Sequence, residues 1–567
     1  MAEQAKQHNL RNGGRILVDA LVAQGADHAF CVPGESFLAV LDAFHDSPGI
    51  ALTVCRQEGG ACMMADAYGK QTGRPGLCFV TRGPGATNAS PGLHIAFQDS
   101  TPLILFVGQV GRSMLDREAF QEVDYRRLFG QLAKWVAEID DARRIPEYVA
   151  RAYATAMSGR PGPVVLALPE DMLRERVEAP PAPRARPAVT RPGGPELEEL
   201  GERLFRAERP FAILGGSRWS PAGVAAFQRF AEAWDLPVGC SFRRQDRFDN
   251  GHDCYAGDVG IGLNPALARR LAESDLILLV GGRMGEIASG GYKLFDIPTP
   301  KQPLVHVHAA AEELGRVYHP TLAIHASPDA FAQAVAELRP PNGLARGDWR
   351  KGARQDYLAW STPPAVNTRL DLGQVVRTLE ERLGPDAVFC NGAGNYTTWV
   401  HRFHRYRGLG TQLAPTSGSM GYGTPAAVAA KRIQPDRPVV AFAGDGCFLM
   451  NGQELATAVQ YGAAILVIVV NNAMYGTIRM HQERHYPGRV SATDLVNPDF
   501  AQLARAYGAF GEVVEETAGF APALEQALAS GGPALLELRI DPEMITPTAT
   551  LSGLRAASQA KPVPEGE

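Results

Sequence analysis

Two apolar segments in the last third of the chain end at side chains that can bind a metal ion. Residues 438–443 read as a buried strand and lead into a Gly-Asp-Gly turn centred on Asp445. The next apolar segment, residues 465–470, ends at Asn471 and Asn472. A carboxylate, an amide oxygen and a backbone carbonyl are hard oxygen ligands, which suit Mg²⁺ shared with phosphate groups. These residue types therefore predict a metal and phosphate site.

The order strand, helix, strand predicts a right-handed β-α-β unit with parallel strands. Both strand ends then open on one edge of the sheet, so that Asp445 and Asn472 meet there. Gly444 and Gly446 let the backbone approach a bulky ligand. The amides of Gly446 and Cys447 open a helix, where a phosphate is favoured. The alternative is a purely structural role, in which these residues form an ordinary β-α-β unit with a tight turn and a capping asparagine.

The Gly-Asp-Gly turn and the Asn-Asn pair together resemble the signature of thiamine diphosphate (ThDP) enzymes. The resemblance implies that Asp445, the Asn472 side chain and the Met474 carbonyl hold Mg²⁺ against the diphosphate of the cofactor. Tyr475 is expected to be an additional phosphate contact.

Glu58 is the second candidate for chemistry. It follows an apolar strand, residues 50–55, and opens a helix. A glutamate in a first helical turn is also favoured by the helix dipole, by about 0.3–1 kcal/mol, so a purely structural role is the alternative. The segment 55–69 resembles the part of ThDP enzymes whose glutamate bonds N1′ of the aminopyrimidine. By that resemblance Glu58 is expected to be catalytic and to bind the cofactor.

The chemistry explains why such a site needs a carboxylic acid. The C2 proton of the thiazolium must be removed, and an acid bonded to N1′ favours the imino tautomer that can take it. Burial away from water favours the protonated acid. The organic chemistry belongs to the cofactor, and the protein supplies tautomer control and geometry.

Further cofactor contacts follow from the same resemblance. In the Gly-rich segment 417–423, Met420 would be the apolar wedge under the bent cofactor, and the Gly418 carbonyl would accept from the 4′-amino group. The alternative is a Gly-rich helix entry with one core methionine. Asn395 and Tyr396 match positions that touch the diphosphate in acetolactate synthases, although the residue types differ from the usual Gln-His pair.

Two N-terminal segments also resemble acetolactate synthase. The segment 82–88 ends at Asn88, which we expect to contact the cofactor. Residues 119–122 resemble a Phe-Gln segment that lines the active site, where Gln121 would orient a substrate carbonyl or relay a proton through water. The alternative for Gln121 is a polar loop residue. Glu35 is either a second acid/base or a capping residue.

Composition narrows the function classes. The chain has 567 residues, 45% hydrophobic and 21% charged, which indicates a soluble protein of three or four domains. A net charge of −5 gives no reason to expect a nucleic acid partner. We find no apolar run long enough to span a membrane and no signal-peptide core near the start. The eight cysteines form no Cys-x-x-C pair, which favours reduced thiols and a cytoplasmic location.

Helical and strand patterns alternate through three blocks, which predicts an α/β protein of three doubly wound parallel-sheet domains. A stretch at 178–195 with six prolines reads as a linker, and residues 339–367 read as a second one. The tail after residue 541 reads as an arm or a partly disordered segment. By resemblance the predicted domains are a pyrimidine-binding domain at 1–177, a Rossmann-like central domain at 196–338 and a diphosphate- and Mg-binding domain at 368–545.

The order of the blocks matches the group of acetolactate synthase, pyruvate decarboxylase and benzoylformate decarboxylase. Residues 472–479 look more like benzoylformate decarboxylase, but Thr81 stands where that enzyme has a catalytic histidine. His94 is isolated, so the histidine pair of pyruvate decarboxylase has no counterpart. His481 stands at about the place of the acceptor-selecting tryptophan of acetolactate synthases.

The resemblance therefore implies a ThDP- and Mg²⁺-dependent carboligase that joins a decarboxylated 2-oxo acid to a second carbonyl compound. The alternatives are a decarboxylase that releases an aldehyde, a 2-hydroxyacyl-CoA lyase, and an inert ThDP-binding scaffold. The family places its sites between subunits, so we expect a homodimer or homotetramer. The Gly-Gly turn at residues 281–283 fits an adenine nucleotide, so the central domain is expected to bind FAD, ADP or nothing.

Overall fold

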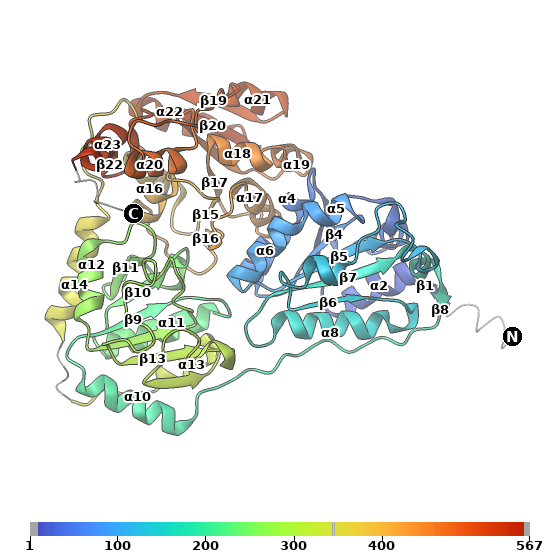
Figure 1. Cartoon of the computed structure of the whole chain (residues 1–567), viewed down its shortest axis with the longest axis horizontal. Helices are drawn as coiled ribbons and strands as arrows, with labels where there is room; N and C mark the ends of the chain where they lie inside the picture. Colours follow the sequence, from blue (N-terminus) through green and yellow to red (C-terminus); the bar gives the residue numbers. More distant parts are fainter. Residues whose placement is uncertain (1–9, 343, 345, 561–567) are drawn as a thin grey trace, which may run out of the picture. The chain divides into compact units, whose positions relative to one another are not determined.

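The computed structural model describes residues 10–342, 344 and 346–560. It is an α/β protein built on three six-stranded parallel sheets, with helices packed against each sheet (Figure 1). The chain divides into two compact units. One holds the N-terminal sheet together with residues 428–433, and the other holds the central and C-terminal sheets. Within the described ranges no helix has the length and apolar character needed to cross a membrane.

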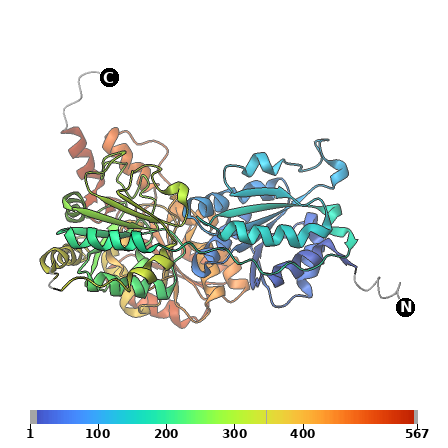
Figure 2. The same ribbon diagram turned by 90° about the horizontal axis from the view of Figure 1, so that it is seen from below.

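The N-terminal sheet has the strand order β3-β2-β4-β5-β7-β6. Its strands are β2 (His28–Cys31), β3 (Ala51–Val54), β4 (Gly76–Val80), β5 (Leu103–Gln109), β6 (Trp135–Glu138) and β7 (Pro163–Pro169). Its helices are α2 (Gly13–Ala23), α3 (Leu38–His45), α4 (Glu58–Thr72), α5 (Pro84–Asn88), α6 (Ser90–Asp99), α7 (Tyr125–Phe129), α8 (Ile145–Met157) and α9 (Glu170–Arg174). A short antiparallel pair joins β1 (Arg11–Asn12) to β8 (Arg176–Val177). Every residue of β4, β5 and β7 is buried, because helices cover both faces of this sheet (Figure 2).

The central sheet has the strand order β11-β10-β9-β12-β13-β14. Its strands are β9 (Pro210–Leu214), β10 (Val238–Ser241), β11 (Tyr255–Val259), β12 (Leu276–Val280), β13 (Leu304–His308) and β14 (Leu322–His325). Its helices are α10 (Gly194–Arg206), α11 (Pro221–Ala233), α12 (Pro265–Glu273), α13 (Pro328–Val335) and α14 (Gly347–Trp360). No helix or strand lies between Val177 and Gly194, in the stretch that the prolines mark as a linker.

The C-terminal sheet has the strand order β16-β15-β17-β18-β20-β19. Its strands are β15 (Val388–Asn391), β16 (Gln412–Leu413), β17 (Val439–Gly444), β18 (Leu466–Asn471), β19 (Phe510–Val514) and β20 (Ala534–Arg539). Its helices are α15 (Leu372–Leu383), α16 (Thr397–Phe403), α17 (Gly423–Ile433), α18 (Asp445–Asn451), α19 (Glu454–Gln460), α20 (Gly476–His485), α21 (Phe500–Ala506) and α22 (Thr517–Ala529).

Two segments carry more structure than the sequence predicts. The expected second linker contains α14, whose Tyr357 packs into the core of the central sheet. Arg346, just before α14, is buried and donates to the carbonyls of Ala207 and Trp234. The tail beyond residue 541 forms the strands β21 (Met544–Thr546) and β22 (Ala549–Thr550) and then α23 (Leu551–Gln559). The linker expectation for residues 339–367 was wrong, because few apolar residues anchor α14 in a polar stretch. For the tail, the strands and helix within residues 544–559 fit the expected arm and not a disordered segment.

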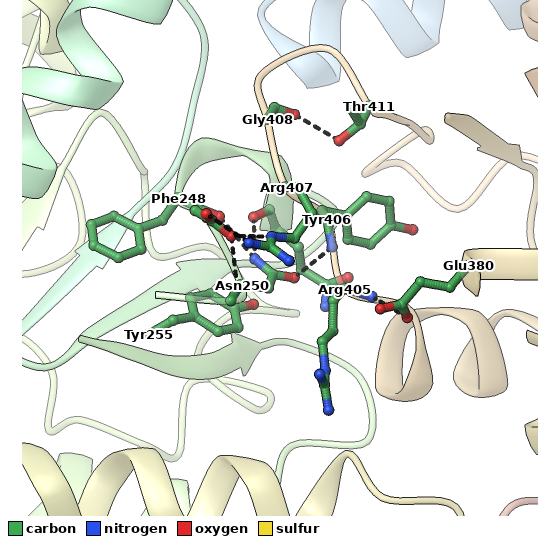
Figure 3. Close-up of polar contacts among 12 residues, drawn as sticks. Phe248, Asn250, Tyr255, Glu380, Arg405, Tyr406, Arg407, Gly408 and Thr411 are labelled. Carbon is green, nitrogen blue, oxygen red and sulfur yellow. Dashed lines mark hydrogen bonds and ion pairs between the residues drawn. The ribbon is translucent and has the colours of Figure 1, made fainter. Parts of the chain in front are cut away.

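The central and C-terminal sheets are joined by a buried polar contact (Figure 3). The Asn250 amide N–H donates to the Tyr406 carbonyl at 2.9 Å, and the Tyr406 N–H donates to the Asn250 side chain at 3.1 Å. Arg407 beside it pairs with Asp249 at 2.6 Å. Gln245 donates its side-chain amide to the His401 carbonyl at 2.7 Å. These bonds hold α16, which follows the predicted diphosphate contacts, against the central domain.

Candidate functional site

Strands β17 and β18 bring the two predicted metal-binding segments together. They are parallel neighbours in which Gly444 pairs with Val470. Asp445 is the first residue of α18, and this helix begins directly after the end of β17. Asn471 is the last residue of β18, and Asn472 follows it at the same edge of the sheet. The carboxyl ends of neighbouring parallel strands are where ligands bind in open α/β sheets.

Asp445 is buried, with 3% of its surface exposed, and hydrogen bonds hold its carboxylate in a fixed position. One carboxylate oxygen accepts from the Gly446 N–H at 2.8 Å, and the other accepts from the Asn497 amide at 2.8 Å. Burial raises the pKa of Asp445, and these hydrogen bonds act in the opposite direction. A buried carboxylate is stabilised when it pairs with a cation, so this position suits a metal ligand.

All the predicted cofactor and metal residues of this domain line one pocket of about 260 Å³. They are Asn395, Tyr396, Gly418, Met420, Asp445, Gly446, Cys447, Asn472, Met474 and Tyr475. The residues come from four separate stretches of sequence, so the fold brings together groups that the sequence shows only as scattered motifs.

Backbone geometry explains the glycine and the turn at this pocket. A Cβ on Gly446 would lie 2.6 Å from the Tyr475 ring, so only glycine lets that ring approach the turn. Ala473 adopts a left-handed φ of 55°, between the two predicted ligands Asn472 and Met474. A non-glycine residue at positive φ carries strain that the surrounding structure must hold.

Asn395 and Tyr396 differ in where their side chains go. Asn395 lines the pocket and accepts from the Thr477 hydroxyl at 2.9 Å. The Tyr396 hydroxyl lies 3.3 Å from the Cys447 sulfur, and the Gly421 N–H donates to that sulfur at 3.2 Å. The polar end of Tyr396 is therefore used inside the protein, while its ring forms part of the pocket wall.

The donor set fits Mg²⁺ and a diphosphate. It combines one buried carboxylate, the amide oxygen of Asn472 and the Met474 carbonyl, which are hard oxygen ligands. The Gly446 and Cys447 amides lie at the start of α18, where a phosphate is favoured. Mg²⁺ usually needs only one or two carboxylates because phosphates and water complete its shell.

In the N-terminal unit, Glu58 opens α4 after β3, and Asn88 ends α5 after β4. The Asn88 amide donates to the Glu58 carboxylate at 3.0 Å. Both residues follow the carboxyl ends of strands in one parallel sheet, which is why two residues 30 positions apart come into contact. The contact orients the carboxyl group that we predict to bond the aminopyrimidine.

Gln121 lies in a strained loop beside this edge. It has a left-handed φ of 66°, as do Asp116 at 61° and Glu118 at 53°. The Glu122 carboxylate holds the loop by accepting from the Asp116 and Ala119 N–H groups at 2.7 and 2.9 Å. Clustered strain of this kind is typical of functional loops.

Arg82 ties that loop to the rim of the N-terminal site. It is 8% exposed and donates to the Phe120 carbonyl at 3.3 Å. It also forms ion pairs with Glu35 at 3.1 Å and Glu170 at 3.4 Å. Thr81, directly before it, lies 2.9 Å from the Ser36 hydroxyl. Glu35 thus keeps a mostly exposed carboxylate at the rim.

Two residues beside the predicted metal ligands were not predicted from the sequence. Asn497 bridges Asp445 and Asn471 through its amide, at 2.8 and 3.0 Å. Glu537 accepts from the Asn471 amide at 2.9 Å. Asn497 lies in a polar loop with no pattern to single it out. Glu537 could have been found, because a glutamate inside the buried strand β20 needs a partner.

The Gly-Gly turn of the central domain has a packing explanation. A Cβ on Gly281 would lie 2.7 Å from the Gly215 carbonyl, and one on Gly216 would lie 1.9 Å from the Gly281 carbonyl. The turns after β9 and β12 therefore pack backbone to backbone. This packing accounts for the glycines without a bound nucleotide, and FAD or ADP binding stays a prediction.

Three family models match the chain in order. Residues 11–128 match the N-terminal TPP binding domain of thiamine pyrophosphate enzymes, where TPP is another abbreviation for ThDP. Residues 197–335 match the central domain of these enzymes, and residues 392–538 match their C-terminal TPP binding domain.

Curated relatives cover nearly the whole chain. It is 31% identical to the acetolactate synthase isozyme 2 large subunit of Escherichia coli K12, over 94% of this chain and 96% of that protein. It is 31% identical to the acetolactate synthase large subunit of Parasynechococcus marenigrum, over 93% and 87%. It is 32% identical to an acetolactate synthase of Mycobacterium bovis, over 91% and 86%. These matches show that the chain belongs to the thiamine diphosphate-dependent enzymes and is related to acetolactate synthase.

Proposed function

We propose that the enzyme decarboxylates a 2-oxo acid and joins the remaining fragment to a second carbonyl compound, with ThDP and Mg²⁺ as cofactors. Bound ThDP supplies the carbon nucleophile and the electron sink for loss of CO₂. Asp445, Asn472 and the Met474 carbonyl are the groups that we assign to Mg²⁺. They lie at one edge of one sheet, in the pocket described above.

Glu58 is the group that we assign to the aminopyrimidine. Its carboxyl is oriented by the Asn88 amide, so a proton held on the free oxygen can be presented in one direction. Gln121 is the group that we assign to the substrate carbonyl. Its loop is fixed by Arg82 and Glu122, which limits the freedom that its amide would lose on binding substrate.

The observation that favours ligation is the contact between Thr81 and Ser36. Thr81 stands where benzoylformate decarboxylase has its catalytic histidine. The Thr81 hydroxyl is hydrogen-bonded to the Ser36 hydroxyl at 2.9 Å. The site therefore has no imidazole at this position to protonate the reacting carbon. Slow protonation leaves time for attack on a second carbonyl compound.

Release of an aldehyde is the second candidate, because Glu35 offers an acid at the rim of the same site. Its carboxylate pairs with Arg82 at 3.1 Å, and 68% of the side chain is exposed. Because it is exposed, this carboxylate can take up a proton from water and, once released from Arg82, donate that proton to the reacting carbon. The two candidates differ in product and can be separated directly.

We further propose that the working form is a homodimer or homotetramer. By family resemblance, Glu58 of one subunit and Asp445 of another would complete each site. A closed two-fold dimer would then contain two identical sites.

The test is a product assay with ThDP, Mg²⁺ and ¹³C-labelled pyruvate, with and without benzaldehyde. Ligation predicts a product with the mass of the acceptor plus one labelled acetaldehyde unit, and without an aldehyde a product that contains two pyruvate-derived units. Glu58→Gln is the control for background chemistry. Labelled acetaldehyde as the sole product would contradict ligation and support the second candidate.

A further inference from the structure

A second cavity lies between the central and C-terminal domains, inside one compact unit. Its volume is about 310 Å³, and it is separate from the cofactor pocket except that both are lined by Asn395. The central domain contributes the end of β11 and the loop after it, including Asp258. The C-terminal domain contributes Thr398 and His401 of α16 and Arg484 of α20. A cavity of this size can hold a small organic molecule.

The walls of this interdomain cavity are fixed by the polar contact in Figure 3. Asn250 and Tyr406 exchange two hydrogen bonds across the domain boundary. Gln245, which lines the cavity, receives a hydrogen bond from the Gln412 amide at 3.0 Å and donates to the His401 carbonyl at 2.7 Å. The cavity is thus formed before any ligand arrives, which lowers the entropy cost of binding.

Asp258 is the unsatisfied charged group of this cavity. It lies on β11, and its Oδ1 is buried without a hydrogen-bond partner among the described residues. Burial raises the pKa of Asp258 to about 7, and the Arg243 guanidinium offsets this only in part. A buried carboxylate is costly unless it is paired with a positive charge, and a cationic ligand in the cavity lowers that cost.

Asp258 is the group in this cavity that can pair with a cation, because the other ionisable groups described next are arginines or a histidine. Arg402 stacks on the Trp360 ring at 3.6 Å and donates to the Trp360 carbonyl at 2.8 Å. Burial lowers the pKa of His401 well below its usual value, so its imidazole is neutral. Arg484 is exposed, so water solvates its guanidinium group.

We propose that this cavity is a binding site for a small molecule with a primary ammonium group, and that Asp258 is the partner of that group. The ammonium pairs with the Asp258 carboxylate where that residue lines the cavity, while the walls from β11 and α16 enclose the rest of the ligand. The site does not depend on the reaction proposed above, because it is defined by a cavity outside the cofactor pocket.

The test measures binding to the full chain by isothermal titration calorimetry, with butylamine, 4-aminobutanoate and butanoate as probes. We expect saturable binding of both amines and none of butanoate at the same concentrations. Asp258→Asn is expected to weaken amine binding at least tenfold. The matched control is Asp253→Asn, which removes a carboxylate from an exposed position five residues away and leaves amine binding unchanged.

The dependence on pH adds a second readout. Amine binding by the wild type should strengthen from pH 6 to pH 8 as Asp258 ionises, since the facing groups Arg243, Arg402 and Arg484 stay charged and the Tyr406 phenol stays neutral. Asp258→Asn should lose this dependence. Equal binding of butanoate and butylamine to the wild type would overturn the proposal, and so would amine binding that Asp258→Asn leaves unchanged. Absence of saturable amine binding would overturn it as well.

Discussion

At the residue scale, the candidate metal site is a set of oxygen-bearing side chains that are held by their neighbours. Asp445 is fixed by Gly446 and Asn497, and Asn471 is fixed by Glu537. The sequence reveals Asp445 and Asn472 because they follow strand-like segments at a recognisable spacing. It hides Asn497, because a hydrogen bond from a distant polar loop leaves no local pattern.

Replacing Asp445 should remove the metal site. Asp445→Ala should abolish Mg²⁺-dependent retention of ThDP, because the one carboxylate of the donor set is lost. Asn497→Ala should have a smaller effect, about 10- to 100-fold in Mg²⁺ affinity, because it only orients the ligand. The measurement is calorimetric titration of ThDP at varied Mg²⁺. Asp436→Ala, an exposed carboxylate of the same domain, is the control. Wild-type retention by Asp445→Ala would refute the metal assignment.

At the element scale, parallel strands and their following turns decide which residues meet. β3 and β4 place Glu58 and Asn88 in contact, and β17 and β18 place Asp445 beside Asn471. The sequence predicted the class of sheet, doubly wound and parallel, but not the strand order, because continuous apolar segments do not show which strands are neighbours. The left-handed backbone of the loop that carries Gln121 could not be anticipated, since its left-handed residues are not glycines.

The position of Gln121 depends on Gly83. Gly83 has a φ of 57°, and a Cβ there would lie 2.8 Å from the Gln121 Cβ. Gly83→Ala should therefore cost about 1–2 kcal/mol of stability from positive φ and also displace Gln121. Gly73→Ala is a matched control, because Gly73 has a φ of 67° and open space around it. Melting temperatures should fall in both variants, but kcat/KM should fall at least tenfold only in Gly83→Ala. Equal kcat/KM values would show that Gln121 has no role.

The turn after α16 should make the protein sensitive to acid. His404 is buried, stacks on Phe389 at 3.8 Å, and burial lowers its pKa to about 3. The unfolded chain binds a proton below about pH 6.5 and the folded chain does not, so stability is lost as pH falls from 6.5 toward 3. At pH 5 the loss from this residue is about 2 kcal/mol. Denaturation midpoints at pH 7 and pH 5 should differ less in His404→Phe than in the wild type. The exposed His319→Phe should keep the wild-type difference, and an unchanged difference in His404→Phe would contradict the assignment.

At the scale of the whole molecule, three similar sheets follow one another along the chain. Their class was predictable because helices and apolar strands alternate, and the structure has three six-stranded parallel sheets. The helix α14 was not predictable, because it is anchored by a few residues such as Tyr357 in a polar stretch. The interdomain cavity could not be predicted either, because the residues that surround Asp258 come from distant parts of the sequence.

Shared sites between subunits predict complementation. Glu58→Gln and Asp445→Ala should each be inactive alone. In a dimer of one variant subunit with the other, one site would carry both changes and the other would carry neither. Co-refolding equal amounts should therefore restore up to about a quarter of wild-type activity, since half of the dimers are mixed and half of their sites are intact. No recovered activity in mixed dimers isolated by two affinity tags would place both residues in one subunit's site.

The central claim is that this chain binds ThDP and activates it through Glu58. The most direct measurement is the rate at which the C2 proton of bound ThDP exchanges with deuterium, followed by NMR after acid quench. For Glu58→Gln we predict unchanged ThDP binding by calorimetry and an exchange rate lower by at least about 100-fold. Exchange at the wild-type rate in Glu58→Gln with ThDP bound, or wild-type protein that fails to bind ThDP at saturating Mg²⁺, would contradict the account.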